Sequence, residues 1–115
     1  MNHFPKIWGT NNEIYSNDIC SVNVLHIKKG GTCSLHTHKS KHNVFYVISG
    51  QLKIKTDKGD SVLSQGHSFT VFAETKHQFQ ALEDTVAVEV MFVKYDPQDI
   101  DRESVGYLDA GEENE

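Results

Sequence analysis

Long hydrophobic runs are absent from this sequence of 115 residues, and no stretch approaches the roughly 20 apolar residues needed to cross a bilayer. The opening residues contain neither a basic region nor an apolar run, so no secretory leader is expected and the predicted location is the cytoplasm. A basic stripe of the kind that binds nucleic acid is also missing. These absences predict a globular chain without a membrane or nucleic-acid partner.

Cysteine is scarce as well, because the chain contains only Cys20 and Cys33, without CxxC spacing. In a cytoplasmic protein, two such residues are most simply interpreted as small buried hydrophobic side chains rather than as a disulfide. A chain of this length can form only one hydrophobic core, so a single domain is predicted.

The net charge of −5 is distributed unevenly along the chain. Residues 1–95 contain ten Lys and Arg against eight Asp and Glu, a balance of +2. Residues 96–115 contain only Arg102 against eight acidic residues, a balance of −7. The acidic character therefore belongs to the C-terminal tail, and the body of the chain would not repel an anionic ligand.

Short β-rich runs alternate with turn residues, and no helical periodicity of useful length occurs. Residues 51–56 alternate between apolar and lysine side chains, which indicates a strand with one wet face. Residues 86–93 are apolar on both faces except at Glu89, which predicts a central strand. The predicted strands are 21–27, 34–38, 44–49, 51–56, 61–63, 68–72, 77–81 and 86–95. Short strands without helices indicate an all-β sandwich or barrel.

The predicted organisation is one domain over residues 1–108, with an N-terminal arm to about 19, a barrel over about 20–95 and an extension over about 96–108. In this short polar extension, Asp96 suits the N-cap and Pro97 the first position of a helix. Residues 109–115 are expected to form an acidic frayed tail. Because small barrels usually cover their edge strands by pairing, a homodimer is expected.

Three of the seven histidines are placed as metal ligands would be. His36 and His38 lie two residues apart in a β-like run, so their side chains would leave the same face of the strand. His77 begins a later apolar run. Neutral imidazoles bind transition metals, and an open coordination position would make the metal a Lewis acid or a redox centre. The alternative is that these histidines are exposed or hydrogen-bonded without a metal.

The spacing around these histidines resembles the two sequence motifs of the cupin superfamily. The first motif would comprise Gly30, His36, His38, Asn43 and Gly50, and the second would run over residues 66–77. The resemblance implies a jelly-roll barrel, the double-stranded β-helix of cupins. It also implies a divalent transition metal, with Zn, Fe, Mn and Ni as candidates, bound by His36, His38 and His77.

Asn43 stands where the resemblance implies an acidic fourth ligand, three residues before Tyr46. Either Asn43 binds the metal through its carbonyl oxygen, or the metal has three protein ligands and water. In both cases the site lacks one negative charge. That loss should weaken the binding of hard cations and favour an anionic ligand.

Further short motifs resemble the cupin domain of type II mannose-6-phosphate isomerases. They are PKIWG at 5–9, SLHTH at 34–38, VEV at 88–90 and the DI and Arg positions within 99–102. The chain departs from that family at Asn43 and in lacking the family's final arginine. The resemblance implies an isomerase acting on a sugar phosphate or a related small carbohydrate anion.

Two further residues are candidates for the chemistry. Glu89 could act as a general base with a raised pKa, the alternative being a rim glutamate paired with a lysine. Lys41 lies close in sequence to the histidines and is the candidate for binding an anionic substrate. Besides the isomerase, an Fe(II)-dependent small-molecule dioxygenase and a non-catalytic small-molecule-binding cupin stay open, because one fold serves many functions.

Overall fold

Antiparallel strands make up nearly all of the regular structure in the computed structural model, which describes residues 2–93, 104, 106–107 and 113–114. The strands are β1 (Asn2–Lys6), β2 (Gly9–Ser16), β3 (Cys20–Ile27), β4 (His42–Ser49), β5 (Gln51–Thr56), β6 (Gly59–Ser64), β7 (Ser68–Val71), β8 (His77–Ala81), β9 (Thr85–Phe92), β10 (Gly106–Tyr107) and β11 (Glu113–Asn114). Among the described residues, no helix is long and apolar enough to cross a membrane.

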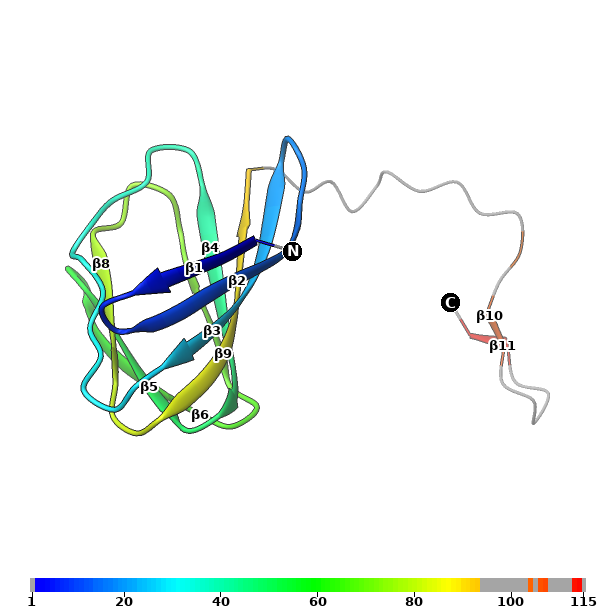
Figure 1. The fold of residues 1–115 in the computed structure, drawn as a ribbon. Coiled ribbons are helices and arrows are strands. Elements are labelled where there is room, and N and C mark those ends of the chain that lie inside the picture. The colour runs from blue at the N-terminus through cyan, green and yellow to red at the C-terminus, as the bar shows by residue number, and fades with distance from the viewer. Residues whose placement is uncertain (1, 94–103, 105, 108–112, 115) are drawn as a thin grey trace.

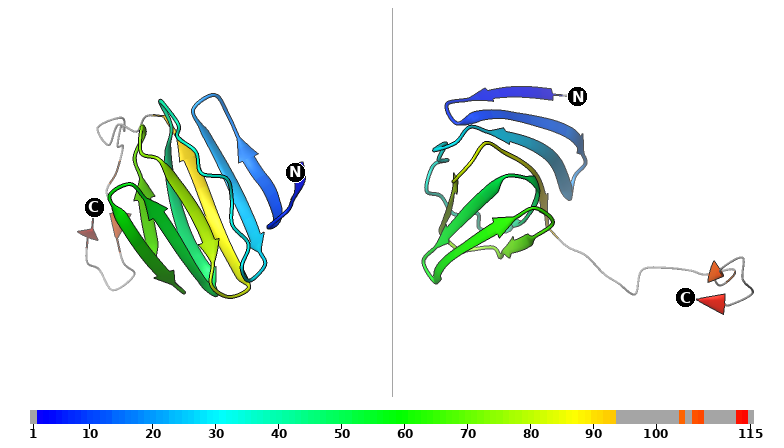
Figure 2. Two further views of the ribbon diagram at one scale, coloured as in Figure 1. Left: turned by 90° about the vertical axis from the view of Figure 1, so that its left-hand side faces the viewer. Right: turned by 90° about the horizontal axis from the view of Figure 1, so that it is seen from below.

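Two sheets enclose the interior (Figures 1 and 2). The larger sheet has the order β1-β2-β3-β9-β4-β7, and the smaller has the order β6-β5-β8. Strand β9 pairs along its length with both β3 and β4, so the predicted central strand is confirmed. The prediction of an all-β jelly-roll barrel is also confirmed.

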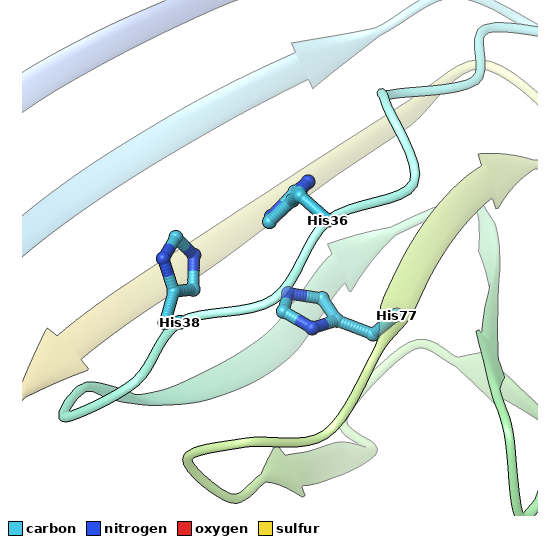
Figure 3. Close-up of side chains that lie close together, drawn as sticks. All are labelled: His36, His38 and His77. Atoms are coloured by element: carbon cyan, nitrogen blue, oxygen red, sulfur yellow. The ribbon is translucent and has the colours of Figure 1, made fainter.

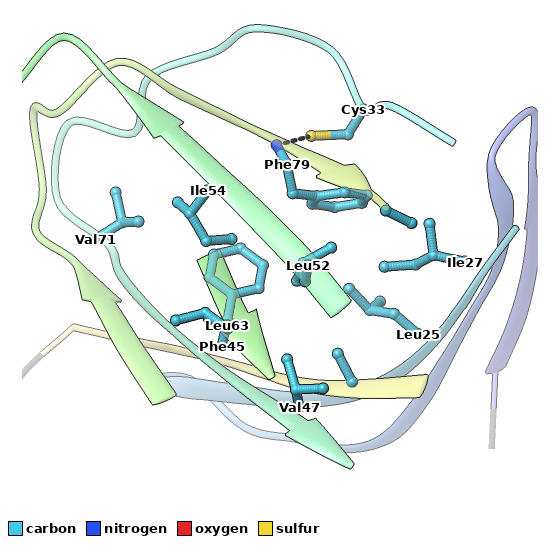
Figure 4. Packing of buried hydrophobic residues seen from close by; sticks show 12 residues of the cluster. Leu25, Ile27, Cys33, Phe45, Val47, Leu52, Ile54, Leu63, Val71 and Phe79 are labelled. Atoms are coloured by element: carbon cyan, nitrogen blue, oxygen red, sulfur yellow. Dashed lines mark hydrogen bonds between the residues drawn. The ribbon is translucent and has the colours of Figure 1, made fainter. Parts of the chain in front are cut away.

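Alternating side chains of both sheets build one core between them (Figure 4). In β5, Leu52 and Ile54 are completely buried whereas the intervening lysines stay partly exposed, as the alternation predicted. The larger sheet contributes the inward-facing Leu25, Ile27, Phe45, Val47 and Ala87. Burial of this apolar surface is the main force that holds the sheets together.

The segment 34–38 is not a strand, so that prediction was wrong. It lies beside β8 and joins it through the isolated bridge from His36 to His77, and a second bridge, from Thr32 to Gln80, lies just before the segment. The ring nitrogen Nδ1 of His36 bonds the carbonyl of Ser34 at 2.8 Å. This local bond uses a backbone group that a regular ladder would need, which explains the irregular path.

Residues expected as an N-terminal arm instead form the β1–β2 hairpin, whose second strand pairs with β3. The hairpin requires Gly9, which has a φ of +150° and follows the turn. A Cβ there would lie 1.8 Å from the His26 carbonyl oxygen, so only glycine fits. Strand β1 is the free edge of the sheet, and the homodimer expected from such edges stays a prediction. The helix expected from Asp96 lies outside the described residues.

Replacing Leu52 with alanine is expected to lower the free energy of unfolding by about 2–5 kcal/mol, because it leaves a cavity in the core. Val62→Ala on the neighbouring strand β6 is the matched control, since that side chain is 49% exposed. Its expected loss is about 0.5 kcal/mol. Urea denaturation of both variants provides the measurement, and equal losses would contradict the assignment of the core.

Candidate metal centre

Three imidazole rings converge on one another from two parts of the chain (Figure 3). His36 and His38 come from the irregular segment between β3 and β4, and His77 is the first residue of β8. Their candidate ligand nitrogens all lie within 4.8 Å of one another. The ring centroids of His36 and His77 are 4.4 Å apart, and those of His36 and His38 are 4.9 Å apart. The predicted grouping of these three histidines is therefore present.

The hydrogen bonds of His36 and His77 engage Nδ1 and leave Nε2 of each ring available to a metal. A backbone carbonyl can only accept, so Nδ1 of His36 donates to Ser34 at 2.8 Å and Nδ1 of His77 donates to Thr75 at 2.9 Å. Each Nε2 then carries the lone pair, as it does in metal-binding histidines. Nε2 of His77 is buried and has no hydrogen-bond partner among the described residues. A metal ion would satisfy this nitrogen, which is costly to bury without a partner.

The electrostatics keep His38 and His77 in the form that binds metals. Burial lowers the pKa of His77 most; the bond to Thr75 opposes this effect, and the nearby His36 adds a smaller lowering. Burial also lowers the pKa of His38, with added repulsion from His36, His77 and Lys41. Both rings are therefore neutral near neutral pH, so little proton competition opposes a metal ion.

Asn43, which is buried, and Glu89, which lines the same cavity as the histidines, form a hydrogen-bonded pair. The amide nitrogen Nδ2 of Asn43 donates to Oε2 of Glu89 at 2.7 Å. The amide oxygen Oδ1 of Asn43 is buried without a hydrogen-bond partner among the described residues. Burial raises the pKa of Glu89, while the bond from Asn43 and the proximity of His36 act in the opposite direction. Glu89 thus pairs with Asn43 rather than with a lysine at the rim.

A cavity of about 370 Å³ opens onto the histidine cluster and Glu89. Its remaining polar lining comes from Thr32, Ser34 and the β1–β2 hairpin, which contributes Lys6 and Asn11. Sequence reasoning missed the hairpin residues because strands 2–6 and 9–16 lack an alternating apolar pattern. The apolar lining is formed by Ile7, Trp8, Cys33, Phe45, Phe79 and Met91.

The sequence matches the family model of the cupin domain over residues 23–94, more than half of the chain. The chain is a cupin. Its predicted superfamily is thereby confirmed, and a search of curated proteins finds no match to it.

Solved structures of other cupins superpose on this one. KdgF from Halomonas sp. has a TM-score of 0.74 at 16% identity, covering 83% of this chain and 90% of that chain. An RmlC-like cupin from Shewanella frigidimarina has a TM-score of 0.73 at 19% identity, covering 81% and 84%. A sugar phosphate isomerase of the cupin superfamily from Silicibacter pomeroyi has a TM-score of 0.64 at 17% identity, covering 76% and 60%. Such low identities establish a shared fold only.

Two residues that lie near the histidines in the sequence do not line the cavity of this cupin. Lys41, predicted to bind substrate, is exposed and lines a separate depression with Met91 and Phe92. His42, next to Asn43, accepts a hydrogen bond from the Ala73 backbone through Nδ1 at 3.0 Å. His42 therefore takes no part in the histidine cluster.

Both cysteines of this cupin are free, as expected. Cys33 lines the cavity, and its Sγ accepts a hydrogen bond from the Phe79 backbone at 3.1 Å (Figure 4). Burial raises the pKa of Cys33 to about 11. The thiol is therefore protonated at neutral pH in the metal-free protein.

Zinc binding to the metal-free protein is expected to be nearly independent of pH between about pH 8 and about pH 7. The pKa values of His38 and His77 are lowered from 6.5, the usual value for histidine, so both rings are already neutral in this range. Calorimetric titrations in buffers of different ionisation enthalpy measure both the affinity and the protons released. Release of two or more protons per zinc at pH 7 would contradict the neutral state of His38 and His77, because ionisation of a zinc-bound water accounts for no more than one.

Proposed function

We propose that this cupin is a metal-dependent enzyme that isomerises a small carbohydrate anion, with sugar phosphates as the first candidates. The supporting observation is that one cavity contains both the histidine cluster and the Glu89 carboxyl group. The motifs shared with type II mannose-6-phosphate isomerases and the similar fold of a sugar phosphate isomerase point to the same reaction class.

In this proposal the metal ligands are His36, His38 and His77, with Asn43 as the fourth. Because Glu89 accepts from Nδ2 of Asn43, the oxygen Oδ1 is the atom left for a cation. A neutral set of imidazole and amide ligands suits zinc, iron, manganese or nickel. Such an ion, when bound, supplies Lewis-acid polarisation of a carbonyl oxygen.

Glu89 is the general base of the proposed isomerisation. It would remove the proton from the hydroxyl-bearing carbon next to the substrate carbonyl and return it to the former carbonyl carbon, while the hydroxyl proton passes to the former carbonyl oxygen and the hydroxyl-bearing carbon becomes the new carbonyl. A raised pKa brings the carboxyl group closer to the working pH, where proton transfer in both directions is efficient. The bond from Asn43 fixes Oε2, so Oε1 is the oxygen that exchanges the proton. Phe45 and Phe79 keep this part of the cavity apolar.

An Fe(II)-dependent dioxygenase is the second candidate. The observation that favours it is the composition of the cluster, three imidazoles without a carboxylate within the described residues. Imidazole is a good iron ligand, and open positions would be available for oxygen and substrate. Metal identity and oxygen consumption distinguish this chemistry from isomerisation.

Elemental analysis of untagged protein is expected to show near-stoichiometric metal in the wild type and its loss in His36→Ala/His77→Ala. The double variant removes two of the converging ligands. His26→Ala/His67→Ala is the matched control, since both side chains are exposed and lie outside the cluster. Equal metal content in all three proteins would exclude the proposed centre.

Glu89→Gln is expected to lower kcat by about 10²–10⁴-fold while leaving the metal content unchanged. The substituted amide still accepts from Asn43, so only the proton-transfer group is lost. The measurement is the exchange of the substrate C–H proton with D₂O. NMR monitors this exchange in mannose 6-phosphate and in fructose 6-phosphate. Oxygen uptake without exchange in the wild type would replace the isomerase with the dioxygenase.

A further inference from the structure

The β1–β2 hairpin contributes two polar residues, Lys6 and Asn11, to the cavity, beside the apolar Ile7 and Trp8 of its turn. Residues directly opposite each other in antiparallel strands share one face of the sheet. Asn11 lies opposite Leu25, and Gly9, the partner of Lys6, lies opposite Ile27. Leu25 and Ile27 point into the core, so Lys6 and Asn11 also lie on the inner face. Both line the cavity that contains the histidine cluster.

The side-chain oxygen of Asn11 is buried without a hydrogen-bond partner among the described residues. Leaving a polar atom in this state costs on the order of 1–3 kcal/mol unless a partner is supplied. A hydroxyl group can both donate and accept a hydrogen bond, so it satisfies an amide in either orientation. Asn11 is therefore suited to a ligand that carries hydroxyl groups.

Lys6 brings a positive charge to the same cavity. Within the described part of the chain the only ion pair is Lys53 with Asp60, so no described carboxylate neutralises the Lys6 ammonium group. Lys6 is also the only lysine of the lining. An ammonium group on a flexible stem binds carboxylate or phosphate as a point charge.

We propose that Lys6 and Asn11 form a specificity subsite of this cavity, in which Lys6 binds the anionic group of the ligand and Asn11 hydrogen-bonds one of its hydroxyl groups. The subsite rests on the proposed function, since it assigns the contacts that select a carbohydrate anion. The cavity volume of about 370 Å³ is near the lower end of the roughly 300–1,000 Å³ range of small-molecule sites. One sugar-sized anion, a carboxylate or a phosphate, fits that volume.

The fluorescence of Trp8 can report ligand binding, because Trp8 is the only tryptophan of the chain and lines the cavity. Its ring lies edge-on to Phe79, with centroids 5.1 Å apart. Fluorescence titration of the zinc-loaded protein therefore measures affinity without turnover. The probes are gluconate and glucose 6-phosphate, with propionate as the anion without hydroxyls and glucose as the sugar without charge.

Lys6→Gln is expected to weaken gluconate and glucose 6-phosphate roughly tenfold or more and to leave glucose unchanged, while Lys6→Arg retains affinity. Asn11→Ala is expected to weaken both hydroxylated anions by roughly tenfold and to leave propionate unchanged. Lys28→Gln and Asn12→Ala are the controls. Lys28 is exposed, Asn12 pairs with Val24 outside the core cluster, and neither lines this cavity.

The outcomes separate the subsite from the proposed function. Binding by the wild type with unchanged affinities in Lys6→Gln and Asn11→Ala would overturn the subsite and leave the reaction standing. Weakened binding in both variants, in a protein that shows no proton exchange, would support the subsite and remove the isomerase. Failure of the wild type to bind either hydroxylated anion would overturn the subsite, and proton exchange with mannose 6-phosphate would still decide the proposed function.

Discussion

The two backbone hydrogen bonds exchanged by His36 and His77 are the constraint on which the candidate centre depends. The His36 amide donates to the His77 carbonyl at 3.0 Å, and the His77 amide returns the bond at 2.9 Å. His36 and His38 would otherwise belong to a connection of residues 28–41, long enough to adopt many conformations. Strand β8 is anchored in the core by Phe79 and Ala81. The two bonds thus fix the position of His36, and of the irregular segment around it, relative to strand β8.

The replacement of an acidic ligand by Asn43 moves negative charge rather than removing it from the region. Glu89 supplies a carboxyl group whose Oε2 accepts a hydrogen bond from Nδ2 of Asn43 at 2.7 Å. In this arrangement the metal would contact a neutral oxygen while the carboxyl group is free to handle a proton. A carboxylate at both positions would place two like charges in a buried space, which raises the pKa of one of them strongly. The neutral Asn43 avoids that repulsion and would leave Glu89 available for the proposed proton transfer.

Much of the barrel and of the centre could be predicted from particular residues. The alternation at 51–56, the apolar strand around Glu89 and the spacing of His36, His38 and His77 all correspond to features of the structure. The segment 34–38 was assigned to a strand because residue types alone do not reveal a local bond such as that from His36 to Ser34. The pairing of Asn43 with Glu89 joins residues 46 positions apart, and no local pattern specifies it.

The hairpin β1–β2 was missed for the same physical reason that makes it relevant to binding. Hydrophobic periodicity detects strands whose inner faces contact a dry core. The inner face of this hairpin carries Lys6 and Asn11, because it covers a cavity rather than packed side chains. Polar residues on the inner face would destabilise a closed core, since each would lose its water without gaining a partner. They are tolerated where water or a polar ligand takes the place of side chains. In this barrel, the strands that are too polar to be recognised by hydrophobic periodicity are therefore the ones that line the cavity.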